Sequence, residues 1–331
     1  MSPLRQAYAN GSESESNKIV VNSSFQARGP QRDENRTLRA PRTALRHGAS
    51  FGNMRKRTSK LGGVGHWSDR SRTAALRPGM KTLENRVALV TGSSRGIGAA
   101  IARLFAERGA SVAVHGRDRL AMSAVRDEII KRGGTTMLVT ADLTRFDEIE
   151  AMRHLVEEQL GPVDVLVANA GGSFTPPGPL EQIPEEGWRA SVDGNLTATF
   201  LTIKSFLPGM RTRGRGNIIT VSSAAARRPH PRSPIPYAAA KAGIQVMTQH
   251  LAAQVGADGI RVNCIAPETI LTERNRQRIS ASQQQDLIES HPVRRLGTPE
   301  DVAEAALFLA SDAASWITGV VLDVAGGSVM A

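Results

Sequence analysis

The chain has 331 residues, carries a formal net charge of +11 and is 40% hydrophobic, 4% aromatic and 22% charged, a globular composition that excludes a fibrous or wholly disordered protein. Its single cysteine, Cys264, excludes an intrachain disulfide and a cysteine-rich zinc module, and we expect no metal site. No apolar run reaches the ~18 to 20 residues of a membrane helix, so we expect a soluble protein of the reducing cytoplasm without a membrane partner.

The positive charge lies in the N-terminal quarter of the chain. Residues 1–83 hold 16 of the 42 Lys and Arg residues and five of the 31 Asp and Glu residues, so residues 84–331 are formally neutral. The segment 1–83 is rich in Ser, Arg, Asn and Gly and has neither helix nor strand periodicity, which predicts disorder.

Three functional interpretations of this basic leader are open. It could be an organelle transit peptide, although its acidic residues count against that, or a segment that contacts phosphates or acidic lipid. We favour the third, a start-site artefact with translation beginning at Met80. No nucleic-acid partner is expected, because no nucleic-acid-binding fold signature accompanies the charge.

A short apolar strand is predicted at residues 86–90, before a glycine-rich turn and a helix over residues 99–107. The turn has the spacing T-G-x-x-x-G-x-G. Its glycines permit a tight turn, a close approach of the backbone to a pyrophosphate and close packing of helix on strand, while free N–H groups at the helix start face the anion. The candidate cofactor contacts in this loop are Gly92, Ser94, Arg95, Gly96, Ile97 and Gly98.

The second predicted strand, residues 111–115, bears on the choice of cofactor. An acidic side chain near the end of this strand bonds the ribose of NAD, whereas an arginine accommodates the 2′-phosphate of NADP. Here Gly116 stands where the acid is expected and Arg117 follows, with Arg95 able to reach the same phosphate. The sequence therefore favours NADP. In the NAD alternative Arg117 is a solvated cation and Asp118 bonds the ribose.

Two further predicted strands, at residues 137–140 and 163–167, are also followed by candidate cofactor contacts. Strands that alternate with helices predict an α/β protein with a single doubly wound (Rossmann) parallel sheet and helices on both faces. Ligands of such sheets bind at the carboxyl ends of the strands. Asp142 could also be a helix N-cap. The residues at these two strand ends are Asp142, Leu143, Asn169, Ala170 and Gly171.

Tyr237 is the single tyrosine of residues 84–331, and Lys241 follows it at i+4 on the same face of a predicted helix. The pKa of a free tyrosine is ~10, and a cation held close by favours the phenolate. This pair therefore points to proton transfer by a phenol.

Two polar residues complete the set of chemical candidates. Ser223 ends a predicted strand at residues 216–223 and could hold a carbonyl oxygen as charge develops on it. It is not expected to be a nucleophile, because no G-x-S-x-G turn surrounds it. Asn195 lies inside a predicted helix over residues 191–210, where asparagine is locally unfavourable, so we expect a packing or functional reason for it.

Together these residues resemble the short-chain dehydrogenase/reductase family over residues 84–331. The family's glycine motif matches Gly92, Gly96 and Gly98, and its serine, tyrosine, lysine and asparagine match Ser223, Tyr237, Lys241 and Asn195. The resemblance implies hydride transfer between a nicotinamide cofactor and a carbonyl or alcohol carbon. It makes Tyr237 the general acid/base and Ser223 the residue that orients the substrate oxygen. It makes Lys241 the binder of the nicotinamide ribose that lowers the tyrosine pKa, and Asn195 the holder of a proton-relay water.

Other segments extend the resemblance. Residues 263–272 are similar to the family stretch after the sixth strand, which adds Pro267, Ile270 and Thr272 as cofactor contacts. Residues 292–303 and 318–327 are similar to the closing helix and strand of tetrameric members, which implies a homotetramer. The leading hypothesis is an NADP-dependent, 3-oxoacyl-carrier-protein-reductase-like enzyme for a small-molecule or carrier-bound carbonyl substrate. The alternatives are an NAD-dependent sugar or alcohol dehydrogenase and a non-catalytic dinucleotide-sensing regulator.

Three departures from the family pattern concern the site. Ala168 replaces the first of two asparagines, and Glu268 replaces the glycine that usually follows proline, placing a carboxylate near the cofactor's approach. Residues 227–236 are rich in proline and arginine; they either attract an anionic substrate or form a solvated loop. Residues 273–291 are expected to form a lid and carry no recognisable substrate code.

Overall fold

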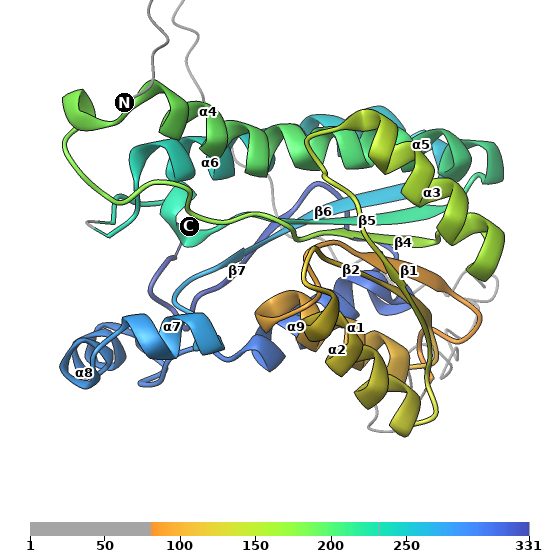
Figure 1. Ribbon diagram of the computed structural model, residues 1–331, viewed down its shortest axis with the longest axis horizontal. Coiled ribbons are helices and arrows are strands. Elements are labelled where there is room, and N and C mark those ends of the chain that lie inside the picture. The colour runs from red at the N-terminus through yellow and green to blue at the C-terminus, as the bar shows by residue number, and fades with distance from the viewer. Residues whose placement is uncertain (1–80, 231, 331) are drawn as a thin grey trace, which may run out of the picture. The chain divides into compact units, whose positions relative to one another are not determined.

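The computed structural model describes residues 81–230 and 232–330 (Figure 1). The prediction of a disordered leader over residues 1–83 therefore lies almost entirely outside the described residues. Leu83, at the end of that segment, is 1% exposed, and its N–H donates to the carbonyl of Arg108 at 2.9 Å. The folded body therefore extends past the predicted boundary and includes Leu83.

In the described part of the chain, seven parallel strands form one sheet in the order β3-β2-β1-β4-β5-β6-β7. The order reverses between β1 and β4, and ligands of open α/β sheets bind at such a switch point, beyond the carboxyl ends of the strands. The strands are β1 (Val87–Val90), β2 (Ser111–His115), β3 (Thr135–Val139), β4 (Val165–Ala168), β5 (Gly216–Val221), β6 (Ile260–Pro267) and β7 (Val321–Val324).

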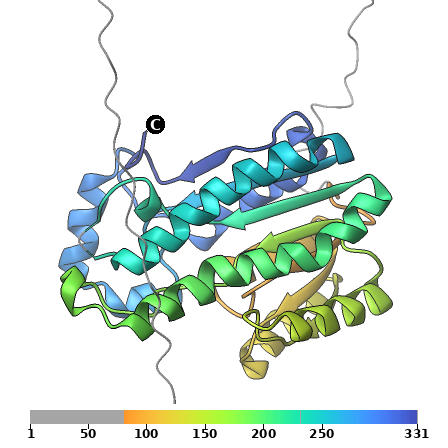
Figure 2. The ribbon, with the colours of Figure 1, turned by 90° about the horizontal axis from the view of Figure 1, so that it is seen from above.

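Helices cover both faces of the sheet, with α1, α2 and α9 on one face and α3, α5 and α6 on the other (Figure 1). In the view from above, α5 and α6 run along the strands on the same face (Figure 2). The helices are α1 (Gly96–Glu107), α2 (Arg119–Lys131), α3 (Phe146–Leu160), α4 (Glu185–Val192), α5 (Ala198–Arg213), α6 (Ile235–Val255), α7 (Glu273–Arg278), α8 (Ala281–Ser290) and α9 (Pro299–Ala310). None of those in the described ranges is long and apolar enough to cross a membrane.

The apolar sequence of β1 explains this layered arrangement. Successive side chains of a strand point to opposite faces. Accordingly Ala88 and Val90 pack into the core beneath α1, together with Phe105, while Leu89 packs into the core on the other face, together with Phe206. A strand that buries both faces needs apolar residues at every position, which is how the sequence reads here.

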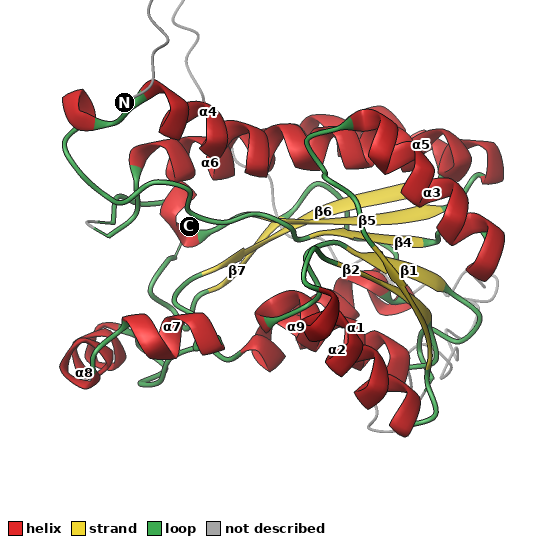
Figure 3. Ribbon diagram, viewed as in Figure 1, coloured by secondary structure: helices red, strands yellow, loops and turns green. Residues whose placement is uncertain are grey.

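The observed elements agree with the predicted doubly wound sheet, but the residues at which some elements begin and end differ from those predicted. The predicted helix over residues 191–210 begins earlier, as α4, continues through a π-helical turn, Asp193–Thr197, and ends with α5 at Arg213. The segment 273–291, predicted as a lid, forms α7 and α8 (Figure 3).

The start of α9 is held by a capping box. The Thr298 hydroxyl accepts the N–H of Asp301 at 3.4 Å, and the Asp301 carboxylate accepts the N–H of Thr298 at 2.8 Å. Arg295 donates to both oxygens of that carboxylate, at 2.6 and 2.7 Å. The bonds from Arg295, and after them those from Thr298, lower the pKa of Asp301 to about 2. Because α9 packs with α1 in one core, this cap supports the helix that follows the glycine loop.

We expect Asp301→Ala to lower the free energy of unfolding by about 1–2 kcal/mol at pH 7, since it removes a helix cap and a charge-assisted hydrogen bond. The folded-state pKa lies below the unfolded value, so this contribution is complete above the unfolded pKa of ~3.9 and is lost as the pH falls toward the folded value. Urea unfolding of both proteins across this pH range measures it. A difference that stays constant with pH would contradict the assignment.

Candidate active site

A cavity of about 810 Å³ opens at the carboxyl ends of the strands, beside the switch point between β1 and β4. Most of the residues predicted for the site line this one cavity. They are Gly92, Ser94, Arg95, Gly96, Ile97, Gly98, Asn169, Gly171, Ser223, Tyr237, Lys241, Pro267, Ile270 and Thr272. Five predicted residues do not line it, namely Arg117, Asp142, Leu143, Ala170 and Asn195.

The glycine loop has the geometry of an anion cradle. Gly96 has a φ of +56°, and a methyl group built on it would lie 3.1 Å from Cγ2 of Thr272. A methyl group on Gly98 would lie 2.4 Å from the carbonyl oxygen of Gly92, so only glycine fits there. The first turn of α1 has no side-chain cap from Arg95. The N–H of Ala99 donates to the Arg95 carbonyl at 3.3 Å, and those of Gly96, Ile97 and Gly98 have no acceptor among the described residues. Such donors suit the pyrophosphate of a dinucleotide.

The loop is fastened to the end of β4. The Thr91 hydroxyl accepts the N–H groups of Asn169 and Ala170, each at 3.0 Å, and donates to the carbonyl of Val167 at 3.3 Å. The Asn169 amide in turn donates to the carbonyls of Thr91 and Gly92, at 2.9 and 3.2 Å. Asn169 and Ala170 therefore act in this structure by holding the glycine loop in place.

The polar residues after β2 and β3 have partners of their own. Asp118 caps α2 by accepting the N–H of Ala121 at 3.1 Å, and its second oxygen accepts from Arg95 at 2.5 Å. Arg117 is exposed. Both oxygens of Asp118 are thus engaged, whereas the guanidinium of Arg117 is accessible from solvent.

Asp142 is exposed, and one of its oxygens accepts the N–H and the hydroxyl of Thr144, at 2.9 and 2.7 Å. These bonds lower the pKa of Asp142, and the charge of Arg117 lowers it further. The alternative that Asp142 is a helix N-cap is wrong, because α3 begins after Arg145. Leu143 is buried, 7% exposed.

His115 does not line the cavity but holds the glycine loop, a role that the sequence analysis missed. Its Nδ1 accepts the N–H of Gly92 at 3.1 Å, and its Nε2 lies 3.1 Å from the carbonyl oxygen of Ala141. Its backbone N–H donates to the Ser93 hydroxyl at 3.0 Å. Burial lowers the pKa of His115, which favours the neutral ring that this arrangement needs. The available signal was a polar residue at the end of an apolar strand.

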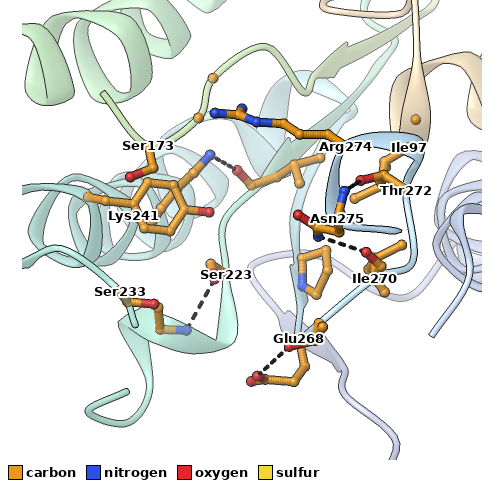
Figure 4. A pocket seen from close by; sticks show the side chains of 18 of the residues that line it. Ile97, Ser173, Ser223, Ser233, Lys241, Glu268, Ile270, Thr272, Arg274 and Asn275 are labelled. Atoms are coloured by element: carbon orange, nitrogen blue, oxygen red, sulfur yellow. Dashed lines mark hydrogen bonds between the residues drawn. The ribbon is translucent and has the colours of Figure 1, made fainter. Parts of the chain in front are cut away.

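Ser223, Tyr237 and Lys241 meet in the cavity from β5 and α6. Ser223 follows β5, and its hydroxyl oxygen accepts the N–H of Ala225 at 3.2 Å. Tyr237 lies in the first turn of α6 and Lys241 one turn later. Lys241 is 3% exposed, its Nζ donates to the carbonyl of Val221 at 2.8 Å (Figure 4), and burial lowers its pKa to about 8. The Ser222 hydroxyl donates to the Lys241 carbonyl at 2.8 Å, which ties β5 to α6.

The protonation of Tyr237 differs from the sequence-based expectation. Burial raises the pKa of Tyr237, hydrogen bonding with Ser223 lowers it, and the charge of Glu268 raises it again. The expected lowering by Lys241 is not found in this geometry. Its Nζ donates to Val221 and lies 5.8 Å from the centroid of the tyrosine ring.

Asn195 lies in the π-helical turn between α4 and α5 and is fully buried. Its side-chain oxygen accepts the N–H of Gly172 at 3.0 Å, and its amide donates to the carbonyls of Gly172 and Ser191, at 2.9 and 2.8 Å. An asparagine is therefore accommodated in mid-helix because its polar atoms fix the segment after β4. Single π turns often mark functional sites.

Charged residues that the sequence analysis had placed near the entrance form ion pairs. Glu268 lies 3.7 Å from Arg228, and its side chain is 10% exposed. Arg227 lies 3.2 Å from Asp323. The interpretation of the segment 227–236 as a solvated loop is therefore wrong for Arg227, which is half-buried and paired, while Arg228 is exposed. Within the described ranges, no cluster of three or more His, Cys, Asp or Glu side chains could hold a metal ion.

Comparison with known proteins agrees with this geometry. The family model described as enoyl-(acyl carrier protein) reductase matches residues 92–328. The 7alpha-hydroxysteroid dehydrogenase of Escherichia coli (strain K12) is 38% identical over 247 residues, which are 75% of this chain and 95% of that protein. The 3-oxoacyl-acyl-carrier-protein reductase of Chlamydia muridarum is 39% identical over 246 residues, 74% and 98% of the two chains.

Solved structures give the same result. The crystal structure of a 3-oxoacyl-acyl-carrier-protein reductase from Brucella melitensis with bound NAD has a TM-score of 0.70 and 32% identity, covering 83% of this chain and 99% of that one. The relatives are named as dehydrogenases and reductases of carbonyl or CH–OH groups, and this chain is an oxidoreductase of the same kind. The chain belongs to the short-chain dehydrogenase/reductase family.

Proposed function

We propose that the protein reduces a carbonyl compound, or oxidises the corresponding secondary alcohol, with NADP(H) as its cofactor. The observation that carries the proposal is the meeting of Ser223, Tyr237 and Lys241 in the same cavity as the glycine loop. A protein that only bound a dinucleotide would need the loop and no acid beside it. A carrier-bound carbonyl is a candidate substrate because the Chlamydia relative is named as an acyl-carrier-protein reductase.

The roles of the chain's own groups follow from their chemistry. When bound, the nicotinamide cofactor supplies the hydride for reduction or accepts it in oxidation. Tyr237 donates its phenolic proton to the substrate oxygen in reduction and removes it in oxidation. Ser223 donates a hydrogen bond to the same oxygen as charge develops there. Because burial raises the pKa of Tyr237, the phenol is protonated at neutral pH, which is the state that reduction needs.

Lys241 and Asn195 support this acid in two different ways. With a pKa of about 8, the Lys241 amine is mostly charged at neutral pH and is available to the hydroxyls of the nicotinamide ribose. The side chain of Asn195 forms hydrogen bonds with the backbone of Gly172. A methyl group built on Gly171 would lie 2.4 Å from the side-chain oxygen of Asn195. Asn195 therefore shapes the segment that faces Lys241. The relay water that the family resemblance implies for Asn195 stays a prediction.

NADP is the cofactor that we favour, with NAD as the alternative. An exposed Arg117 follows Gly116 at the end of β2, and both oxygens of Asp118 already have partners. These features leave a cation, and no free carboxylate, for the ribose of the adenosine half. The Brucella reductase with bound NAD keeps the alternative open.

The proposal also includes the cellular compartment and the oligomeric state. We infer a cytoplasmic protein, because its single cysteine cannot form an intrachain disulfide. We infer a homotetramer, because residues 292–303 and 318–327 resemble the closing segments of tetrameric members of the family.

Tyr237→Phe tests the mechanism. We expect it to lower kcat by at least about 100-fold, since general acid–base catalysis contributes that much or more. Its affinity for NADPH, measured by the fluorescence of bound NADPH, stays that of the wild type. Turnover of a panel of ketones with NADPH and with NADH gives the rates. Wild type that binds NADPH and reduces no ketone would instead support the dinucleotide-sensing regulator, and unchanged turnover by the variant would refute the proposed acid.

Arg117→Ala tests the choice of cofactor. We expect about 10- to 100-fold weaker binding of NADPH and little change for NADH, since the variant loses a charge-assisted hydrogen bond to the 2′-phosphate. Fluorescence titration with each cofactor measures both affinities. Arg119→Ala, which removes an exposed arginine two residues further along, is the matched control. Equal losses for NADPH and NADH would count against NADP specificity.

Glu268→Gln tests the coupling between this carboxylate and the acid. The charge of Glu268 raises the pKa of Tyr237, so its removal lowers that pKa. In the reductive direction we therefore expect the alkaline limb of the kcat/KM profile to move to lower pH, and in the oxidative direction activity to begin at lower pH. An unchanged pH profile in both directions would show that the two groups are not coupled.

A further inference from the structure

The helix α7 is fixed at the mouth of the cavity by its own first turn. The Thr272 hydroxyl accepts the N–H of Asn275 at 3.2 Å, and the Asn275 amide donates to the carbonyl of Ile270 at 2.8 Å (Figure 4). Thr272 also packs against the glycine loop, since a methyl group on Gly96 would lie 3.1 Å from it. The backbone of Arg274, between these two anchors, therefore has a defined place above the cavity.

The side chain of Arg274 lines the cavity and reaches across it. Its guanidinium end points toward Ser173 and away from Ile97 of the glycine loop (Figure 4). A methyl group built on Gly172 would lie 3.7 Å from Nη1 of Arg274. The guanidinium thus ends beside the segment after β4, on the side of the cavity opposite the loop that suits the pyrophosphate.

This guanidinium has no carboxylate within 4.0 Å and no hydrogen-bond acceptor among residues 81–230 and 232–330. Two other arginines near the cavity differ, because Arg95 pairs with Asp118 and Arg228 with Glu268. A guanidinium offers a planar fork of donors that matches both oxygens of a carboxylate. One that projects into a binding cavity without a partner is therefore suited to an anionic group of the ligand.

The charged side chains around Arg274 also favour an anionic ligand. Arg278, one turn later on α7, and Arg232, in the loop before α6, line the cavity and have no ion-pair partner in the described part of the chain. Two carboxylates also line it, Glu273 and Glu268, and the second is paired with Arg228. Unpaired cations therefore outnumber unpaired carboxylates at the entrance, and such a lining attracts anions.

We propose that Arg274 binds a carboxylate of the substrate, so that the preferred substrates are carbonyl compounds, or their alcohols, that carry an anionic group. The inference rests on the proposed function and adds its substrate class. The phosphates of the cofactor are the other source of an anion. The direction of the side chain favours the substrate, because the guanidinium points away from the glycine loop.

The test compares two ketones of the same skeleton, 4-acetylbenzoate and its methyl ester, with wild type, Arg274→Ala and Arg276→Ala. Arg276 is the matched control: it lies on the same helix, does not line the cavity and donates to the carbonyl of Leu271. We expect Arg274→Ala to lower kcat/KM for the acid by about 10- to 100-fold, as for other charge-assisted hydrogen bonds, and to leave the ester unchanged. Arg276→Ala changes neither, and Arg274→Lys recovers part of the loss.

A binding measurement separates the sources of the anion and does not depend on turnover. Benzoate, which cannot be reduced, is titrated by calorimetry into each protein saturated with NADP⁺, and NADPH affinity is measured by fluorescence. We expect weaker benzoate binding by Arg274→Ala and unchanged NADPH affinity. A loss of NADPH affinity with an unchanged ratio of acid to ester would assign Arg274 to the cofactor and overturn the inference.

The remaining outcomes distinguish the two proposals. If wild type reduces the ester and Arg274→Ala loses no preference for the acid, the inference fails and the proposed function stands. If wild type turns over no ketone with either cofactor, the proposed function fails. Benzoate binding that is equal in wild type and Arg274→Ala overturns the role of Arg274 in either case.

Discussion

The carboxyl ends of β1 and β4 are bound to each other by the side chains of Thr91 and Asn169, and the rest of the site is positioned from this joint. Two backbone N–H groups and three carbonyls lie close together where the strand order reverses, and each needs a partner once it is withdrawn from water. Threonine and asparagine supply both donors and acceptors in little space. The absence of a side chain at Gly98 then lets α1 begin directly against this joint.

The groups proposed to react lie at a second junction, between β5 and α6, where the Ser222 hydroxyl bonds to the Lys241 carbonyl and Nζ of Lys241 bonds to the Val221 carbonyl. Burial acts on both ionisable groups there and favours the uncharged form of each. It raises the pKa of the phenol of Tyr237 and lowers that of the amine of Lys241. Their common surroundings thus move the two pKa values apart, with the phenol above its ordinary value and the amine below it, before any ligand contributes.

The sequence predicted the sheet and the glycine loop well, because continuous apolar runs bounded by glycines or polar residues mark buried parallel strands directly. It also located Ser223 and Asn169, since strand ends of this fold face the ligand. It could not show which way a side chain turns, and so it missed His115 and the position of Arg274. Nor could it show the balance between burial and charge at Tyr237, because that balance depends on distances set by the tertiary fold.

His115 links the ends of three neighbouring strands through a single neutral ring, which accepts from the glycine loop on one side and faces Ala141 on the other. A doubly protonated imidazole would present a donor to the Gly92 N–H and break that link. Because burial lowers the pKa of His115, protonation of its ring, and with it the loss of this link to the glycine loop, requires a lower pH than protonation of a surface histidine does.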